Sequence, residues 1–533
     1  MKHKLLTIGA IFLTTISLAA CGSKKSASTH KALSVTLPDE PLTADPNKAT
    51  DTNSAGLIFQ TMEGLYTYNK QNKIIPGVAT KVVKPTNNGK TYTFNLKRNA
   101  KWANGQPVIA QDFVNSFRRT VDPKTKAQYA NLYSAFKNYS AIQAGKLAPN
   151  KLGAKAIGRH KLQIQLTKRI PWFNDLAASK YLPLNTAAVK KYGQKYGTNA
   201  SKTMADGPYK LVGWTGSNSS WKYVKNPHYW NAKNVKINQV NVSVTKDENT
   251  AINLFKSGKI QETTVTGQYV RANASNPDLK KHATGRLNYL YFNPQIKKTN
   301  SENLRKALGY IINQKTITQD VLQDGSKPAL NMVIRGDQKN PKTGKDMAED
   351  VGNLLPTSVS KAKNYWNKYL KESGKKSVTM NLLTDDTDED KHIGAYIQSI
   401  AQKNFKGLTI NLTSLPHAQH VARDFDGKFE LNLTGWSTNW RDSYDFLSLM
   451  AKDNSVNFAH WNDPTFNKIL NTANAKTGQA RYDGLVQADK YLMKVMGCIP
   501  LYQPSEAKLI SSKVGGLTYS LLNEAQYQYA YWK

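Results

Sequence analysis

Residues 378–433 limit most strongly what this chain can fold into. Short runs rich in apolar and β-branched residues alternate there with longer amphipathic runs. We predict strands at 378–383, 408–412 and 429–433, and helices at 388–405 and 417–426. Two strand–helix–strand units in succession indicate a partly parallel sheet that helices cover on both faces. The sequence therefore predicts an α/β fold. A further helix is predicted at 301–324, where apolar residues recur every three to four positions.

The segment 435–447, GWSTNWRDSYDFL, follows the last of these predicted strands. It carries four aromatic rings and three ionised side chains. In open α/β sheets ligands bind beyond the carboxyl ends of the strands, so its position makes this segment a candidate binding site. Asp442 and Asp445 have a second interpretation, because the apolar residues that follow indicate a short helix that either carboxylate can cap.

The first twenty residues have the pattern of a secretory signal peptide. Lys2 and Lys4 form a basic start, and the apolar run at 5–18 is too short to anchor the chain stably in a bilayer. Small residues then lead to Cys21 in the sequence LAAC, which resembles the lipobox of bacterial lipoproteins. In that class the cysteine carries lipid and becomes the mature N-terminus. Residues 21–32 are then expected to tether the folded part to the membrane.

Cys498 is the only other cysteine in the 533 residues, so lipid on Cys21 would leave no intramolecular disulfide. The chain is long enough for several domains, and its hydrophobic content of 39% supports a packed core. Trp102 and Phe113 are predicted core residues. The apolar pattern outside the leader contains no run long enough to span a membrane.

The net charge of +37 would draw the protein toward anionic lipid or an anionic wall polymer. A lysine-rich solvated surface explains the same charge more simply. Nucleic acid is not an expected partner, because the leader directs export and the lysines are scattered rather than gathered in one stripe. A basic surface adhesin remains an alternative function.

No catalytic or metal-binding pattern accounts for this chain. HExxH, GxSxG and GxxxxGK[ST] are all missing from the sequence. The acidic run at 385–390 begins like a calcium loop but lacks the glycine and the final glutamate that such a loop needs. His417 and His420, three residues apart, are more simply interpreted as surface or cleft histidines than as metal ligands. We predict no enzymatic activity, no cofactor and no metal.

Several motifs resemble the signature of the oligopeptide-binding lipoproteins that serve ABC importers. They are YTFNLKR (92–98), KWANGQPV (101–108), AQDF (110–113), DGPYKL (206–211), KNPHYW (225–230), NLRKAL (303–308) and the segment 435–447. They follow one another in consistent order, and the resemblance runs from about residue 33 to the end of the chain. It implies a binding protein that captures oligopeptides and delivers them to an ABC permease.

The resemblance also implies an architecture, a two-lobe fold of the periplasmic-binding-protein type II class (cluster C) with an extra domain inserted in lobe I. Lobe I would comprise 33–68, 205–297 and 500–533, the inserted domain 69–204, and lobe II 298–499. A ligand would be enclosed between the lobes as they close about a hinge. Such a protein is expected to be a monomer that is lipid-anchored at the outer face of the cell membrane, on a Gram-positive surface.

Ligand-facing residues are carried over from the resemblance position by position. They are Thr50, Asp51, Tyr129, Tyr133, His417, Gly435, Trp436, Ser437, Asn439, Asp442 and Tyr502. Related proteins hold an extended peptide mainly through backbone hydrogen bonds, which makes their sites tolerant of sequence.

Asn439 departs from the family pattern. The matching segment commonly reads GWxxDYxDPxxFL, and its first aspartate pairs with the free amino group of the peptide. Three explanations stay open. Asp51, Asp442 or Asp445 supplies the missing charge, or the amino group is not anchored, or the ligand is not a peptide. Alternative ligands are therefore a non-peptide solute and a signalling peptide.

Overall fold

The computed structural model describes residues 32–533 except 453, 455 and 521–523. The predicted signal peptide, Cys21 and nearly all of the predicted tether lie outside the described residues. Among the helices within the described ranges, none combines the length and the apolar character that crossing a bilayer requires.

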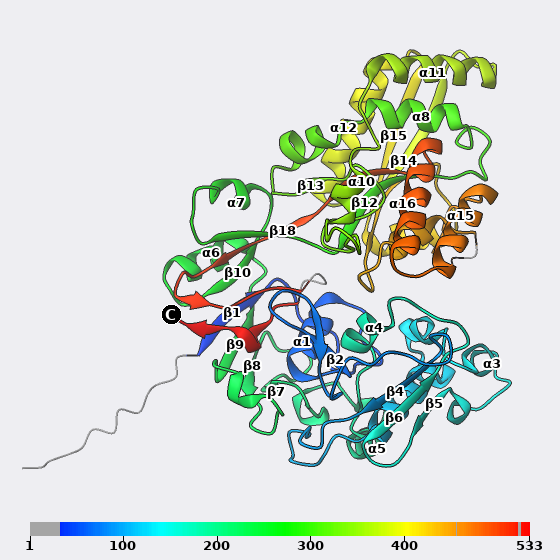
Figure 1. The fold of residues 1–533 in the computed structure, drawn as a ribbon. Helices are drawn as coiled ribbons and strands as arrows, with labels where there is room; N and C mark the ends of the chain where they lie inside the picture. The colour runs from blue at the N-terminus through cyan, green and yellow to red at the C-terminus, as the bar shows by residue number, and fades with distance from the viewer. Residues whose placement is uncertain (1–31, 453, 455, 521–523) are drawn as a thin grey trace, which may run out of the picture. The chain divides into compact units, whose positions relative to one another are not determined.

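The largest sheet has seven strands in the order β11-β18-β10-β1-β9-β8-β7 (Figure 1). Its strands are β1 (Leu33–Leu37), β7 (Tyr209–Val212), β8 (Ser220–Lys225), β9 (Gln239–Val244), β10 (Glu262–Val265), β11 (Leu279–Ala283) and β18 (Ser505–Ile510). β1 pairs in parallel with β9 and β10, whereas β18 runs antiparallel to β10 and β11. The sheet thus joins the first and last parts of the described chain.

A second sheet has six strands in the order β13-β17-β12-β16-β14-β15. They are β12 (Arg286–Phe292), β13 (Lys327–Pro328), β14 (Val378–Asp385), β15 (Leu408–Leu415), β16 (Leu431–Ser437) and β17 (Ile499–Gln503). β14 pairs in parallel with β15 and β16, and β12 pairs antiparallel with β16, so the predicted partly parallel sheet is confirmed. β12 belongs to this sheet although it comes from a segment that we assigned to lobe I. The proposed domain limits stay a prediction.

Two apolar cores lie on opposite faces of the six-stranded sheet, because alternate residues of a strand point to opposite sides. Leu287, Tyr289 and Tyr291 of β12 pack in the core of α15 (Pro464–Ala475) and α16 (Gly478–Val495). Leu290 and Phe292 pack in the other core. That core contains α8 (Glu302–Ile311), α11 (Val359–Ser373) and α12 (Asp388–Asn404).

A third sheet, in the order β4-β6-β5, lies in the region predicted as the inserted domain. Its strands are β4 (Thr91–Asn95), β5 (Ala154–Ala156) and β6 (Lys161–Gln165), and α2 (Ala110–Val121) packs on β5 and β6. Trp102 and Phe113 are both fully buried in this core, which confirms the prediction for these two residues.

Two small antiparallel strand pairs and the remaining α-helices complete the described chain. One is the hairpin of β2 (Tyr66–Tyr68) with β3 (Ile74–Pro76), and the other is the antiparallel pair of β19 (Val514–Gly515) with β20 (Tyr531–Trp532). The helices are α1 (Thr52–Thr61), α3 (Tyr139–Gln143), α4 (Phe173–Ser179), α5 (Thr186–Tyr192), α6 (Glu248–Lys256), α7 (Gly267–Ala272), α9 (Gln314–Thr316), α10 (Met347–Val351), α13 (His417–Phe425) and α14 (Tyr444–Leu447).

The prediction of one helix over 301–324 was wrong. α8 ends at Ile311, the next residue is extended, and α9 starts after Asn313, followed by the π-helical turn η7 (Ile317–Leu322). The side chain of Asn313 accepts hydrogen bonds from the backbone N–H groups of Lys315 and Thr316. This local capping competes with continuation of the helix.

Candidate functional site

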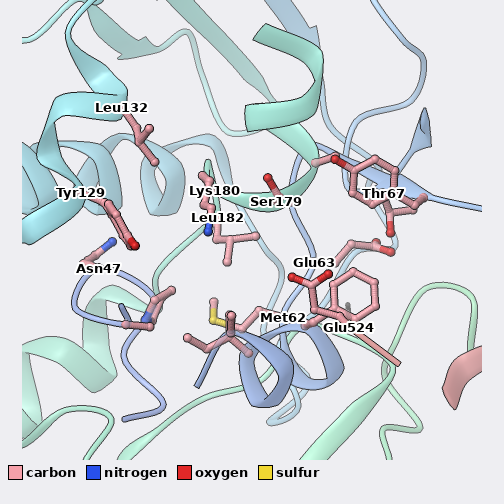
Figure 2. Close-up of a pocket in the computed structure, with 18 of the residues that line it drawn as sticks. Asn47, Met62, Glu63, Thr67, Tyr129, Leu132, Ser179, Lys180, Leu182 and Glu524 are labelled. Carbon is pink, nitrogen blue, oxygen red and sulfur yellow. The ribbon is translucent and has the colours of Figure 1, made fainter. Parts of the chain in front are cut away.

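A pocket lies between the region around α1 and the segment that follows α4 (Figure 2). Apolar side chains such as Met62, Leu132 and Leu182 form much of its wall. The polar residues that line it include Asn47, Glu63, Thr67, Tyr129, Tyr133, Ser179, Lys180 and Glu524. An apolar pocket with a few convergent polar groups is the usual composition of a small-ligand site.

Tyr129 and Tyr133, both expected to face a ligand, line this pocket in different ways. Tyr129 is 38% exposed and lies with its ring near the ammonium of Lys180. Tyr133 is almost fully buried and packs against Phe117 and Tyr181, with ring centroids 5.6 and 4.9 Å away. Tyr129 therefore offers the pocket a hydroxyl and an aromatic face, whereas Tyr133 is mainly a core residue.

Asp51 and Thr50 lie at the start of α1. Asp51 caps the helix, because its Oδ1 accepts a hydrogen bond of 2.7 Å from the backbone N–H of Ser54. Its Oδ2 is buried and has no hydrogen-bond partner among the residues that the structure describes. Burial and the charge of Asp51 raise the pKa of Tyr129. Thr50 is exposed. Asp51 thus holds, near Tyr129, one buried carboxylate oxygen that has no partner within the described ranges, although Asp51 itself is not among the residues that line the pocket.

Glu63 is the most firmly held acid of the pocket wall. It accepts a hydrogen bond of 2.6 Å from the hydroxyl of Tyr229 and another from the indole of Trp230. Burial raises the pKa of Glu63 to about 7 despite these hydrogen bonds and the nearby charge of Lys97. Glu63 is therefore occupied by protein donors.

Gly435 and Tyr502 both contact the side chain of Asn288 in the six-stranded sheet. Gly435 lies opposite Asn288 in the pairing of β16 with β12, and a Cβ at this position would collide with the Asn288 side chain. The Asn288 amide donates to the Tyr502 hydroxyl, which in turn donates to Glu389 Oε1 at 2.5 Å. Tyr502 is fully buried, so its side chain packs inside the sheet and is not exposed at a surface. Glycine is needed here for close packing of the Asn288 side chain.

The strand before this segment is longer than predicted. β16 continues to Ser437, so Gly435 and Trp436 belong to the strand rather than to the turn that follows it. Trp436 is partly buried and packs against the core of α15 and α16, whereas Ser437 is exposed. The turn itself begins at Thr438.

Asn439 and Asp445 are linked within the turn. The backbone N–H of Asn439 and the hydroxyl of Thr438 both donate to Asp445 Oδ2, at 2.9 Å each. Burial raises the pKa of Asp445 to about 7, against the effect of these hydrogen bonds. The carboxyl group of Asp445 therefore shapes the turn.

Asp442 is held by a buried arginine. Its two carboxylate oxygens each accept a hydrogen bond of 2.8 Å from the guanidinium of Arg481. Oδ1 also accepts the backbone N–H of Tyr444, the first residue of α14, although the N-cap position itself is Ser443, whose side chain makes no capping hydrogen bond. The protein itself uses both oxygens of Asp442.

Trp440 and Arg441 join the turn to the region predicted as the inserted domain. The Trp440 ring stacks on Trp172, with centroids 4.9 Å apart and planes at 10°. Arg441 donates from Nε to Asp175 Oδ1 at 2.9 Å and also to the carbonyl of Asn72. Burial lowers the pKa of the Arg441 guanidinium, but the charge and hydrogen bond of Asp175 together with the nearby Tyr68 and Asp337 outweigh burial, and the net shift is upward. The turn thus contacts the side of the molecule that carries the pocket.

A model of one protein family matches residues 73–458 of this chain. The family is described as "Bacterial extracellular solute-binding proteins, family 5 Middle". The chain belongs to this family. Its members are solute-binding proteins and do not form an enzyme class.

Relatives of this family 5 protein are similar over most of their length. A dipeptide-binding protein of Lactococcus lactis subsp. cremoris is 30% identical, and the similarity covers 87% of this chain and 86% of the relative. The structure of Listeria monocytogenes OppA bound to peptide has a TM-score of 0.78 and 33% identity, covering 94% of this chain and 99% of that one. The pheromone receptor PrgZ has a TM-score of 0.79 and 29% identity, with 94% and 99% covered. The predicted two-lobe type II fold is confirmed by this likeness.

His417 of the family 5 protein is the first residue of α13, is not among the residues that line the pocket, and contacts Asp385 at the end of β14. Its Nδ1 is 2.9 Å from Asp385 Oδ2, and the buried His420 contacts the other oxygen of Asp385 at 2.6 Å. The His417 side chain is exposed, as the prediction of a surface or cleft position requires. In the described ranges no group of three or more histidine, cysteine or acidic residues is arranged to hold a metal ion.

Several residues of the site were not predicted. Lys180, Glu63 and Glu524 line the pocket from distant parts of the chain, and no local pattern marks any of them. Arg441 lies inside the segment that we selected, and an arginine between aromatic residues is a signal that we did not use. The pairing of Arg441 with Asp175 depends on contacts that are remote in sequence.

Proposed function

We propose that this family 5 protein is a receptor that captures oligopeptides and delivers them to the permease of an ABC importer. The observation that carries the proposal is the likeness to peptide-bound OppA of Listeria monocytogenes, at 33% identity over 94% of this chain. The pocket beside α1 and the turn at the end of β16 supply the apolar surface and hydrogen-bonding groups that such a ligand needs. The protein itself would catalyse no reaction.

We further propose a location at the outer face of the cell membrane. The pattern of a signal peptide over 1–20 and the lipobox around Cys21 support export followed by lipid anchoring. A monomer tethered through residues 21–32 would then meet the importer at the membrane surface.

Mass spectrometry of the ligand that co-purifies with the mature protein tests the proposal. We expect a series of peptides with mixed sequences. A single non-peptide mass would overturn the proposed function. A single peptide sequence would favour a signalling peptide, an alternative that the similarity to the pheromone receptor PrgZ supports.

A salt titration separates peptide capture from adhesion to an anionic polymer. The charge of +37 would make adhesion weaken steeply as ionic strength rises, because exposed charges are screened. Binding of an uncharged peptide inside a pocket is expected to change little over the same range.

Of the three acids that we considered as substitutes for the missing aspartate, Asp51 is the best candidate. Arg481 occupies both oxygens of Asp442, and the turn occupies Asp445, whereas Asp51 Oδ2 has no protein partner among the described residues. We therefore propose that Asp51 attracts the amino group of the peptide. Asn439 contributes only neutral hydrogen bonds in this arrangement.

Restoring the carboxylate by Asn439→Asp is expected to tighten the binding of peptides with a free amino terminus by about tenfold. A hydrogen bond to a charged partner is stronger than a neutral one by about 1–1.5 kcal/mol. Isothermal titration calorimetry with tetra-alanine and N-acetyl-tetra-alanine measures the difference. Asn439→Ser, which adds no charge, serves as the control. Equal tightening of both peptides would show that residue 439 does not face the amino group.

A further inference from the structure

We propose that Lys180 recognises a carboxylate group of the ligand in the pocket beside α1. The inference rests on the proposed function and adds the chemical class of one ligand group. Lys180 follows the last residue of α4 and lines the pocket. Figure 2 shows its nitrogen directed into the space between Tyr129 and Glu63.

The ammonium of Lys180 has no strong partner in the protein. Within the described ranges the structure gives its Nζ no hydrogen bond and no ion pair. Its one defined contact is with the ring of Tyr129, whose centroid is 5.6 Å away. Burial lowers the pKa of Lys180, and the charge of Glu524 acts in the opposite direction without reaching ion-pair distance. The Lys180 side chain is only partly exposed, and a partly buried ammonium without a protein anion is stabilised when an anion joins it.

A fully enclosed lysine of the same protein, Lys508, shows how the fold pairs an ammonium that has a structural role. Lys508 lies 2.8 Å from Glu506 Oε1 and 3.6 Å from Glu262 Oε1, and it also donates to Thr264. Lys180 faces a pocket rather than the core, and its ammonium has no acidic or hydroxyl partner of this kind in the described part of the chain. The comparison indicates that the partner of Lys180 arrives with the ligand.

The two acids in the pocket wall, Glu63 and Glu524, have hydrogen-bond partners other than Lys180. Glu63 is occupied by Tyr229 and Trp230, and Glu524 accepts a hydrogen bond from the hydroxyl of Ser520. The Tyr129 ring lies beside Lys180, and its hydroxyl, which is protonated at neutral pH as in any tyrosine, is a second donor in the pocket lining. A carboxylate between Lys180 and Tyr129 would accept from both groups, which is the geometry that favours an anion over a neutral amide.

Two parts of a peptide carry a carboxylate, the side chains of aspartate and glutamate and the terminal carboxyl group. The test uses tetra-alanine as free acid and as amide, together with tetra-alanine peptides in which each position in turn is glutamate or glutamine. Calorimetric affinities are measured for the wild type, Lys180→Gln, Lys180→Arg and Lys190→Gln. Lys190 is an exposed lysine of α5 and provides the same charge change outside the pocket.

We expect Lys180→Gln to weaken the binding of one carboxylate-bearing peptide by about tenfold or more relative to its amide counterpart. Lys180→Arg should keep that preference, and Lys190→Gln should leave every affinity within about twofold. A loss at one glutamate position assigns a side chain, and a loss for the free acid alone assigns the terminal carboxyl group. Equal losses for acid and amide members would overturn the role of Lys180 but not peptide binding. If no peptide of the series binds the wild type, the proposed function fails, and the role of Lys180 fails with it.

Discussion

Replacing Lys508 with methionine is expected to lower the free energy of unfolding by about 3–5 kcal/mol at neutral pH. Lys508 is almost fully buried on β18 and neutralises the buried Glu262 and the largely buried Glu506 of the same sheet, whose side chain is 19% exposed. The variant leaves the buried carboxyl group of Glu262 and the largely buried one of Glu506 without their counter-charge. Urea unfolding followed by tryptophan fluorescence measures the loss, and Lys222→Met, an exposed position on β8, is expected to change stability by less than about 0.5 kcal/mol.

Stability should depend on pH in opposite directions in the wild type and in Lys508→Met. Burial alone would raise the pKa of Glu506, but the charges and hydrogen bonds of Lys508 and His282 together outweigh burial and hold the pKa at about 2. A carboxyl group with a lowered pKa stabilises the fold above its ordinary value of 4.5, and this contribution, about 3 kcal/mol, is lost as the pH falls toward 2. In Lys508→Met the pKa of Glu506 should instead be raised by burial. Acidification from pH 7 toward 4.5 should then raise the free energy of unfolding of the variant. If wild type and variant instead lose stability in the same way as the pH falls, Lys508 does not lower the pKa of Glu506.

The parts of the fold that were predicted correctly are those that local periodicity determines. The strands and helices of residues 378–433 were found within a few residues of their predicted limits, because each buries one regular set of apolar side chains. The end of β16 was misplaced because Thr434 and Gly435 interrupt the apolar pattern. The strand continues to Ser437 because β12 provides pairing partners, with Gly435 opposite Asn288 and Ser437 opposite Arg286. That information lies almost 150 residues away in the sequence.

Some residues of the candidate site could be predicted from the sequence, and others could be recognised only from the fold. The resemblance to a family led to Tyr129 and Tyr133, which line the pocket, but no local pattern distinguishes Lys180 from the other lysines of a strongly basic chain. The role of a charged side chain can be inferred only when the residues around it in the fold are known. Lys180 and Lys508 look alike in the sequence, yet one faces an open pocket and the other is enclosed by acids.

Arg481→Met is expected to destabilise the protein by about 3–5 kcal/mol, because Asp442 would remain buried without its counter-charge. The side chains of Arg481 and Asp442 are only 5% and 10% exposed, and two hydrogen bonds of 2.8 Å join them. Asp445 lies close by, so the uncompensated carboxylate would also face a second acid. Urea unfolding measures the effect, and Arg423→Met, at an exposed position on α13, is the control. The double variant Arg481→Met/Asp442→Asn should recover part of the loss, since it removes the buried charge.

The same pair decides between two interpretations of Asp442, which the family resemblance placed among the ligand-facing residues. If Asp442 contacts the ligand, Asp442→Asn should weaken peptide affinity strongly and stability only slightly. Because Arg481 occupies both oxygens, we expect the reverse, with a large loss of stability and a change of less than about threefold in the affinity of the folded protein. A calorimetric titration below the unfolding temperature of the variant, together with its unfolding curve, measures both quantities. A strong loss of affinity in a stable Asp442→Asn variant would return Asp442 to the ligand site, and the turn at the end of β16 would then bind the peptide through its acid as well as its backbone.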